Sequence, residues 1–448
     1  MNWKTNSPKW WLSIILPSVL LLGGCGNDKE ASDVSSPSPG EKESSKAAAQ
    51  PPEPVELVFY SLGQSTEESF NELYGNAIRQ KYPHFKLTYI VRSGSASIED
   101  YMTQLLMSNK IDINFDSIGN IPSSLWKNLL QSDMTELIAE HKLDLSQYEK
   151  TAVDGMRDPA KKEIHGLPVI NVNRLLYFNK DLFNKFGVPF PTDGLSWEKA
   201  NELGRQMTRM DSGIQYFGLA SSKEHQIRMN ALSVPLLDPV TQKSTIRSDE
   251  RWRSIFEQGL FAPYQDSGYR AAIAKGLPSR SWFTKNQNLA MYVYLSFMPA
   301  NEPESFDGLN WDMVSEPSYS QAPGISSQVY PTYFSIVSSS KKKDAALQAI
   351  QVLMSPEHQS YLARKGQMPV LNKEELKREL GQDTKFKDKN WKAVFHNKFA
   401  PIPYKSVLDV DLEKVYLNQH LDYALGKIDL NTLFRNAEEE ANKLIESR

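Results

Sequence analysis

The sequence predicts an α/β protein whose folded body consists of two lobes, each a sheet flanked by helices. From Val55 onward, apolar strand-like runs alternate with amphipathic helical stretches, as in repeated β-α-β units. In residues 166–189, two strand-like runs follow one another without a hairpin turn, so this stretch is expected to cross between two sheets. Residues 55–448 are also long enough for two domains of ordinary size.

Residues 1–25 have the pattern of an export signal. Lys4 and Lys9 precede an apolar stretch at 10–22, which is shorter than the about 20 residues that a mature spanning helix needs. Leu22-Gly23-Gly24-Cys25 fits the lipobox pattern L-x-G-C, and Cys25 is the chain's single cysteine. We therefore expect lipid attachment at Cys25, which would hold the protein on the outer face of the cell membrane. The alternative is ordinary cleavage after small residues, with Cys25 incidental.

Residues 26–54 are rich in Ser, Pro, Ala, Glu and Lys and show no apolar period. This composition predicts a disordered tether between the anchor and the folded body. The formal net charge of the chain is −3. This charge excludes a strongly basic nucleic-acid surface and leaves small neutral ligands open.

The first half of the body has a regular pattern of strands and helices. The expected elements are a strand at 55–60, a helix ending at Tyr82-Pro83, a strand at 85–91, a helix at 97–108 and a strand at 111–115. Ligands of mostly parallel sheets collect at the carboxyl ends of the strands. Five pocket candidates follow from this rule: Tyr60, Ser61, Asp116, Ser117 and Asn171.

Around the expected crossing, strands are predicted at 167–170 and 175–178. A short helix from about residue 179 is expected to end at Gly187, where φ > 0 is needed. Ser196 is expected to cap a further helix, in which Trp197 packs in the core. Residues 288–297 form the most apolar strand candidate of the second half.

Alternation in that strand candidate places Tyr292 and Tyr294 on one face and Phe297 on the other, unless the strand breaks at Ser296. Residues 308–324 are polar and contain proline, so they are expected to form a second crossing or a loop. Further elements are expected as a helix at 249–260, a strand at 330–337, a helix at 342–354, a helix starting at Ser355-Pro356-Glu357 and a final helix at 430–447.

Common catalytic and metal motifs are absent from the sequence. The seven histidines show no metal spacing, no serine lies in G-x-S-x-G, and there is no G-x-x-x-x-G-K. Asp409-Val410-Asp411 begins like a calcium loop but lacks the glycine at its sixth position. We therefore expect no catalytic residue, no metal site and no cofactor, although spacing alone does not exclude a glycosidase pair of acids.

Several segments carry a family resemblance. The first two are Gly166-Leu167-Pro168-Val169 and L-x-Y-F-N-K-D-L-F at 175–183, which is followed by G-V-P at 187–189. The other two are Ser196-Trp197-Glu198 and residues 341–369, which end in G-x-x-P. In this order, and after a lipobox, they resemble the family 1 extracellular solute-binding proteins of ABC importers, which include the maltose-binding protein group. Where that family shows G-K-A-A-M and then Gly and Trp, this chain has N-Q-N-L-A-M at 286–291 and then Leu295 and Phe297. We therefore expect a pocket that differs from the family's common one.

The resemblance implies a two-lobed periplasmic-binding-protein-like fold of type II. Lobe one would hold residues 55–170 plus 318–362 and lobe two residues 171–317 plus 363–448, with hinge crossings near 170–173 and 316–318. A monomer would capture a polar solute, expected to be an oligosaccharide, between the lobes and deliver it to ABC permease subunits. The expected ligand-binding residues are Tyr60, Ser61, Asp116, Asn171, Tyr294, Phe297 and Tyr333.

Two alternatives stay open from the sequence. The same fold could present its ligand to a sensor or act as a surface protein, or the chain could be a secreted carbohydrate-active enzyme. The aromatic content of 10% suits sugar binding in either case, because aromatic rings stack on the C–H face of a pyranose.

Overall fold

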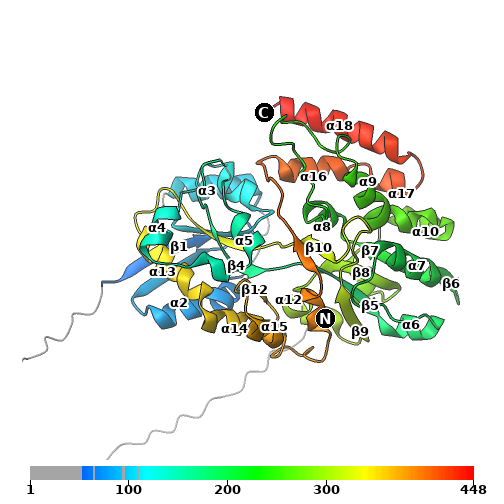
Figure 1. Cartoon of the computed structure of the whole chain (residues 1–448), viewed down its shortest axis with the longest axis horizontal. Coiled ribbons are helices and arrows are strands. Elements are labelled where there is room, and N and C mark those ends of the chain that lie inside the picture. The colour runs from blue at the N-terminus through cyan, green and yellow to red at the C-terminus, as the bar shows by residue number, and fades with distance from the viewer. Residues whose placement is uncertain (1–52, 64–65, 93–95, 109, 159) are drawn as a thin grey trace, which may run out of the picture. The chain divides into compact units, whose positions relative to one another are not determined.

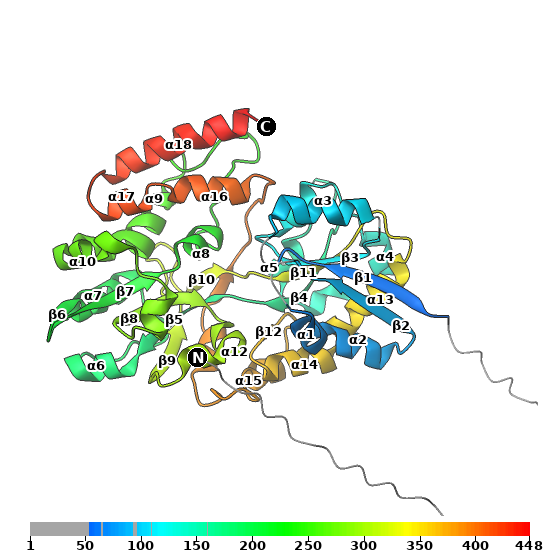
Figure 2. The same ribbon diagram turned by 180° about the vertical axis from the view of Figure 1, so that it is seen from behind.

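The computed structural model describes residues 53–63, 66–92, 96–108, 110–158 and 160–448 (Figure 1). The predicted signal, Cys25 and nearly all of the predicted tether lie outside these residues. The described residues form one unit, which contains two main sheets with helices on their faces (Figures 1 and 2). The predicted α/β class with two sheets is confirmed.

The first sheet has six strands in the order β12-β4-β11-β3-β1-β2. Strand β1 pairs in parallel with both β2 and β3, whereas β11 runs antiparallel to β3 and β4. The strands are β1 (Val55–Tyr60), β2 (Phe85–Ile90), β3 (Ile113–Ser117), β4 (Leu167–Asn171), β11 (Thr332–Ile336) and β12 (Met368–Pro369). Predicted strand 55–60 is thus confirmed to the residue, and predicted strand 111–115 lies two residues later.

Helices cover both faces of this sheet (Figure 2). They are α1 (Glu67–Phe70), α2 (Asn76–Lys81), α3 (Ile98–Ser108), α4 (Thr135–Glu140), α5 (Lys150–Asp154), α13 (Lys343–Met354), α14 (Pro356–Arg364) and α15 (Glu374–Glu379). On one face the core is aromatic: Phe70 packs 5.1 Å from Phe59 and 5.5 Å from Phe115 between ring centroids. The start of α14 forms as predicted, because Ser355 Oγ accepts from the backbone N–H of His358 at 3.3 Å.

The second sheet has five strands in the order β6-β7-β8-β5-β9. They are β5 (Arg174–Asn179), β6 (Arg209–Asp211), β7 (Ile214–Ser221), β8 (Leu289–Leu295) and β9 (Trp311–Ser315). The expectation of a crossing or loop throughout 308–324 is wrong for 311–315, which pair antiparallel with β5. The apolar side chains of Trp311 and Met313 are buried there, and this local alternation was masked by the polar residues around it.

The helices on the second sheet begin and end near the predicted residues. Gly187 follows α6 (Lys180–Phe186) with φ 67°, and Ser196 caps α7 (Trp197–Met207), in which Trp197 is fully buried. The remaining helices are α8 (Lys223–Arg228), α9 (Arg251–Phe256), α10 (Ser267–Ala272), α11 (Arg280–Thr284), α12 (Met298–Asn301), α16 (Asp409–Leu417), α17 (His420–Ala424) and α18 (Leu430–Glu446). Helix α18 packs along α16 at one side of this sheet (Figure 1).

The chain passes between the two sheets at three places. It leaves the first sheet after Asn171 and enters the second at Arg174. It returns between β10 (Ile325–Gln328) and β11, and the backbone N–H of Tyr330 donates to Val172 O at 2.7 Å, so these two crossings lie side by side. A third passage follows β12: β13 (Lys398–Ala400) pairs in parallel with β10 in a separate two-stranded sheet, and the chain on either side of it, at Val394 and Leu412, packs in the core of the second sheet. The second crossing thus lies at 329–331 rather than near 316–318, where it was expected, while the lobe limits at 170, 318 and 362 stay a prediction from the sequence.

A buried ion pair fixes the crossings to the second sheet. Arg174 and Glu316 are fully buried, and the Arg174 guanidinium hydrogen-bonds both Glu316 and Gln226. The other carboxylate oxygen of Glu316 accepts from the backbone N–H of Ser327 at 2.7 Å, and Ser327 Oγ accepts from the N–H of Arg174 at 3.1 Å. The start of β5 is thereby tied to the strand that leads into the second crossing.

Candidate ligand-binding site

The ends of strands from both sheets supply the loops of the candidate site. In the first sheet, the parallel strands β1 and β3 lead into loops at 61–63 and 118–121. In the second sheet, the parallel strands β7 and β8 lead into helix α8 and into the turn at 296–297. Carboxyl ends of parallel strands are where α/β sheets bind ligands, because loops and helix N-termini converge there.

Asp116 organises the loops of the first sheet. Its buried carboxylate accepts from Ser61 Oγ at 2.9 Å, from the backbone N–H of Leu62 at 3.1 Å and from Asn114 Nδ2 at 3.0 Å. Burial raises the pKa of Asp116, and the hydrogen bonds from Asn114, Leu62 and Ser61 act in the opposite direction. The predicted site residues Ser61 and Asp116 therefore lie next to each other, and their side chains hydrogen-bond each other.

Three further predicted site residues lie in the interior. The hydroxyl of Tyr60 donates to Ser124 O at 3.0 Å, and that of Tyr333 donates to Ala152 O at 2.5 Å; both side chains are fully buried. Asn171 is also fully buried, and its Oδ1 accepts from the backbone N–H of Val172 at 3.2 Å. These side chains stabilise the first lobe in the arrangement described here.

Tyr294 and Phe297 are partly exposed and come from the end of β8. The strand ends at Leu295, so it breaks at Ser296, which was the alternative left open by the sequence. Tyr292 and Tyr294 share a face and stack at 5.5 Å between ring centroids with an interplanar angle of 16°. The His225 ring lies edge-on to Tyr294 at 5.3 Å, and together they form a half-open aromatic surface.

Charged groups lie at the rim of this aromatic surface. The Arg280 guanidinium carbon is 5.8 Å from the Tyr294 ring centroid, and Arg280 forms an ion pair with Glu302. Burial raises the pKa of Tyr294, so its phenol stays protonated to a higher pH than a free tyrosine does. A protonated phenol, a guanidinium and a carboxylate together offer both donors and acceptors to a polar ligand.

A second cluster joins the two sheets, and we call it the Arg228 cluster: Arg228, Glu413, Tyr330, Ser117 and Gly119. Arg228 binds Glu413 through Nε and Nη2, both at 2.7 Å, and donates from Nη1 to the Tyr330 hydroxyl at 2.9 Å. Ser117 Oγ of the first sheet donates to the same hydroxyl at 3.1 Å. Helix α8 of the second lobe is thus connected to the end of β3.

The electrostatics of this region favour an uncharged ligand. Arg228 is compensated by Glu413, and although burial opposes the charge of Arg228, Tyr330 and Glu413 raise its pKa. Burial lowers the pKa of His225 to about 3, with Arg228 and Arg174 acting in the same direction, so His225 is neutral at pH 7. Its Nδ1 is 2.7 Å from Ser222 Oγ.

Of the Arg228 cluster the sequence identified only Ser117 as a candidate pocket residue, and it did not identify His225. Their positions in the chain, from residue 117 to residue 413, share no local motif, and only the tertiary fold brings them together. Among the described residues, no group of three or more His, Cys, Asp or Glu side chains is placed to hold a metal ion. No helix in the described part of the chain is both long and apolar enough to cross a membrane.

No protein family model and no curated protein sequence matches this chain. Solved structures do match it across most of its length. An ABC substrate-binding protein of Listeria monocytogenes, in complex with cycloalternan, matches with a TM-score of 0.71 and 17% identity over 88% of this chain and 100% of that one. A sugar transporter of Rhizobium etli, in an open conformation, matches with a TM-score of 0.69 and 18% identity over 87% and 99% of the two chains.

The cyclic alpha-maltosyl-1,6-maltose binding protein of Arthrobacter globiformis matches with a TM-score of 0.65 and 12% identity over 88% of this chain and 100% of that one. At these identities the likeness shows a common fold. The chain therefore has the predicted two-lobed, periplasmic-binding-protein-like fold of type II.

Proposed function

We propose that this protein binds an oligosaccharide between its two lobes and delivers it, unaltered, to an ABC permease. The observation that carries the proposal is the half-open aromatic surface of Tyr294 and His225 at the carboxyl ends of the second sheet. Tyr294 packs against a cluster that includes Leu62 and Ile118 from the loops of the first sheet. The proteins of this fold reported above include ones solved with, or described as binding, cyclic sugars. Fold likeness raises the expectation of sugar binding, and the chemistry of the site agrees with it.

Tyr294 and Phe297 are the residues that we propose to contact the sugar directly. Both are partly exposed, and an aromatic face suits the C–H groups of a pyranose. Arg280 and Glu302 at the rim would hydrogen-bond the hydroxyl groups. Ser61 and Asp116 would act from the other side, by holding the loop at 61–63 in the shape that meets the ligand.

Closure of the lobes is the proposed mechanism. Two adjacent crossings, at 172–173 and 329–331, would bend while the sheets move as rigid bodies. The ligand would stabilise the closed arrangement because it contacts both lobes only there. A micromolar affinity corresponds to about −8 kcal/mol, which stacking and shared hydrogen bonds supply in a site of this kind.

A thermal-shift screen of the full-length chain tests this function. The panel contains cycloalternan, mannotriose and maltotriose, with peptides and charged polyols as comparison. We expect one or more neutral oligosaccharides to raise the midpoint of unfolding, and chromatography of the sugar after incubation to show no product. A stabilising peptide with no effect of any sugar would contradict the proposal, and cleavage of the sugar would favour an enzyme instead.

We also propose that a lipid on Cys25 anchors the mature protein to the outer face of the membrane. The supporting observation is the L-x-G-C pattern directly after an apolar stretch. In cells, Cys25→Ala should move the protein from the membrane fraction to the soluble fraction and abolish incorporation of a labelled fatty acid. Incorporation that persists in Cys25→Ala would exclude Cys25 as the attachment site.

A further inference from the structure

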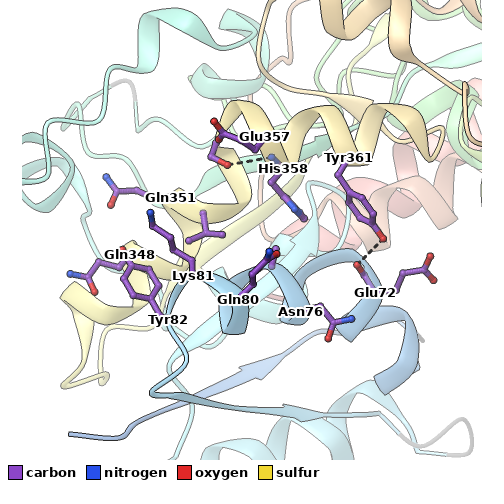
Figure 3. A pocket seen from close by; sticks show the side chains of 13 residues that line it. Glu72, Asn76, Gln80, Lys81, Tyr82, Gln348, Gln351, Glu357, His358 and Tyr361 are labelled. Carbon is purple, nitrogen blue, oxygen red and sulfur yellow. Dashed lines mark hydrogen bonds between the residues drawn. The ribbon is translucent and has the colours of Figure 1, made fainter. Parts of the chain in front are cut away.

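A groove of about 660 Å³ lies on the first lobe, between α2 on one side and α13 and α14 on the other (Figure 3). It shares no lining residue with the aromatic surface of Tyr294 or with the Arg228 cluster. Its volume is within the range of about 300–1,000 Å³ that is typical of small-molecule sites. The groove is therefore large enough for a ligand of its own.

Amide side chains line this groove on both sides. Asn76 and Gln80 project from α2, and Gln348 and Gln351 from α13 (Figure 3). The amides of Asn76, Gln80 and Gln348 make no side-chain hydrogen bond to any residue that the structure describes, and Gln351 makes one long bond of 3.5 Å to His141 O. Each amide offers donors and an acceptor, so the groove presents several free hydrogen-bonding groups to one volume.

His358 adds an acceptor to the wall of the groove. Only 6% of this residue is exposed, and its Nε2 lies 3.0 Å from the carbonyl oxygen of Leu73. Burial lowers the pKa of His358 to about 4, so the ring is neutral at pH 7, and Nε2 must carry the proton to donate to that carbonyl. Nδ1 is then an acceptor, and it receives no hydrogen bond from another described residue. An acceptor without a protein partner on the wall of the groove is open to a donor from a ligand or from water.

Two tyrosine rings stand at opposite ends of the groove, Tyr82 beside Gln348 and Tyr361 beside Glu72 (Figure 3). Tyr82 stacks on Phe85 at 4.7 Å and Tyr361 stacks on His358 at 5.7 Å between ring centroids, so both rings are held in place. An aromatic ring that is fixed on one face can accept a second flat, C–H-rich group on the other.

The charges of the groove argue against an ionic ligand. Glu72 is paired with Lys365 at 3.2 Å, which leaves Glu357 and Lys81 as lining groups of opposite sign. Neither a phosphate nor a strongly cationic ligand would find an excess of opposite charge here. Amides, a neutral imidazole and tyrosine rings are instead suited to hydroxyl groups on a compact ring.

We propose that this groove is a second carbohydrate-binding site, which takes a neutral saccharide on the outer surface of the first lobe. It does not depend on the site between the lobes, so the protein would hold two saccharides at once. A partner protein that docks a helix into the same groove is the competing interpretation.

Nuclear magnetic resonance of the full-length chain with selectively labelled histidines tests this site, because the chain has only seven histidines. The probes are cycloalternan, mannotriose and maltotriose. We expect a saturable shift of the His358 ring signal with at least one probe, with affinity about tenfold weaker in Tyr82→Ala and in Gln348→Ala. Gln382→Ala, which removes an exposed amide outside the groove, is the matched control and should bind like the parent chain.

Tyr294→Ala separates this inference from the proposed function. The variant should leave the His358 shift unchanged even if it abolishes binding between the lobes. A His358 signal that no probe moves, or that moves equally in Gln348→Ala and in the parent chain, would overturn the second site. A shift caused by the permease alone, with none from the sugars, would overturn it in favour of a protein-docking groove.

Discussion

Gly119 and Tyr330 approach so closely that a Cβ atom on Gly119 would lie 2.1 Å from the Tyr330 hydroxyl oxygen. The same Cβ would lie 2.9 Å from Cδ of Arg228, which belongs to helix α8 of the second lobe. Gly119 follows β3 of the first sheet, and Tyr330 lies on the second crossing. The absence of a side chain at residue 119 therefore permits the contact between the lobes.

Gly119→Ala is predicted to disfavour this arrangement of the lobes. Forcing a methyl group into such a packed contact costs about 1–3 kcal/mol, and separation of the lobes relieves the overlap. Small-angle scattering of the ligand-free variant should show a larger radius of gyration, and oligosaccharide affinity should fall about tenfold. Ser123→Ala, in the neighbouring segment and without a side-chain hydrogen bond to another described residue, serves as the control. Identical scattering from Gly119→Ala and the parent chain would count against a closing contact at this position.

The Arg174–Glu316 pair gives a prediction about stability. Arg174→Met should lower the free energy of unfolding by about 3–5 kcal/mol, because it leaves the fully buried Glu316 carboxylate without its cation. Arg174→Met combined with Glu316→Leu should recover most of this loss, since both charges are then removed. Urea denaturation measures both variants. If the double variant were less stable than Arg174→Met, the loss of stability would not come from an unpaired Glu316 carboxylate. It would show that the hydrogen bonds of the ion pair themselves hold the crossings.

The exposed pair Lys427–Asp422 is the matched comparison, because its side chains are 62% and 47% exposed. Asp422→Asn should change the free energy of unfolding by less than about 1 kcal/mol. If Asp422→Asn lowered the free energy of unfolding as much as Arg174→Met does, burial would not explain the effect of Arg174→Met.

The histidines predict that acidification destabilises the fold. The unfolded chain takes up a proton at His358 near its ordinary pKa of 6.5, whereas the folded chain does so only near 4, because the ring is buried. The stabilising contribution of neutral His358 is complete above pH 6.5 and is lost as the pH falls toward 4. At pH 5 this loss lowers the free energy of unfolding by about 2 kcal/mol. Urea denaturation at pH 7.5 and pH 5 should show a smaller difference for His358→Gln than for the parent chain. An equal pH dependence in both chains would mean that His358 does not contribute to it.

Tyr60 and Tyr294 predict opposite phenotypes. Tyr60→Phe removes a buried hydrogen bond to Ser124 O and should destabilise the fold by about 1 kcal/mol, with oligosaccharide affinity unchanged. Tyr294→Ala should weaken affinity about tenfold or more. Parallel thermal unfolding and ligand titration distinguish the two, and a loss of affinity in Tyr60→Phe would place its hydroxyl in the ligand site.

Local signals in the sequence were sufficient for most elements of the fold. Gly187 and Ser355 act where expected, because a positive φ and a side-chain cap depend on a few adjacent residues. Strand β9 was missed, since its five residues stand among polar and proline-containing segments. The pairing of β10 with β13 joins residues about 70 apart in sequence, so no local sequence pattern predicts it.

The candidate site was less predictable than the fold. The rule about carboxyl ends of strands led to the loops of the candidate site, but it did not show that the side chains of Tyr60 and Asn171 are buried. Burial on the two faces of a strand depends on which helices cover them, and that is a tertiary property. Arg228 and Glu413 look like ordinary helix-surface charges in sequence, and only the packing of α8 near α16 makes them a pair.

Isothermal titration of the full-length chain with neutral oligosaccharides, in the parent chain and in Tyr294→Ala, tests the central claim most directly. We predict that the parent chain binds one of them between the lobes at about micromolar affinity, that Tyr294→Ala weakens this binding about tenfold or more, and that the sugar is recovered intact. Equal affinity in the two chains for every sugar that binds, or heat from continuing turnover of the sugar, would contradict the account.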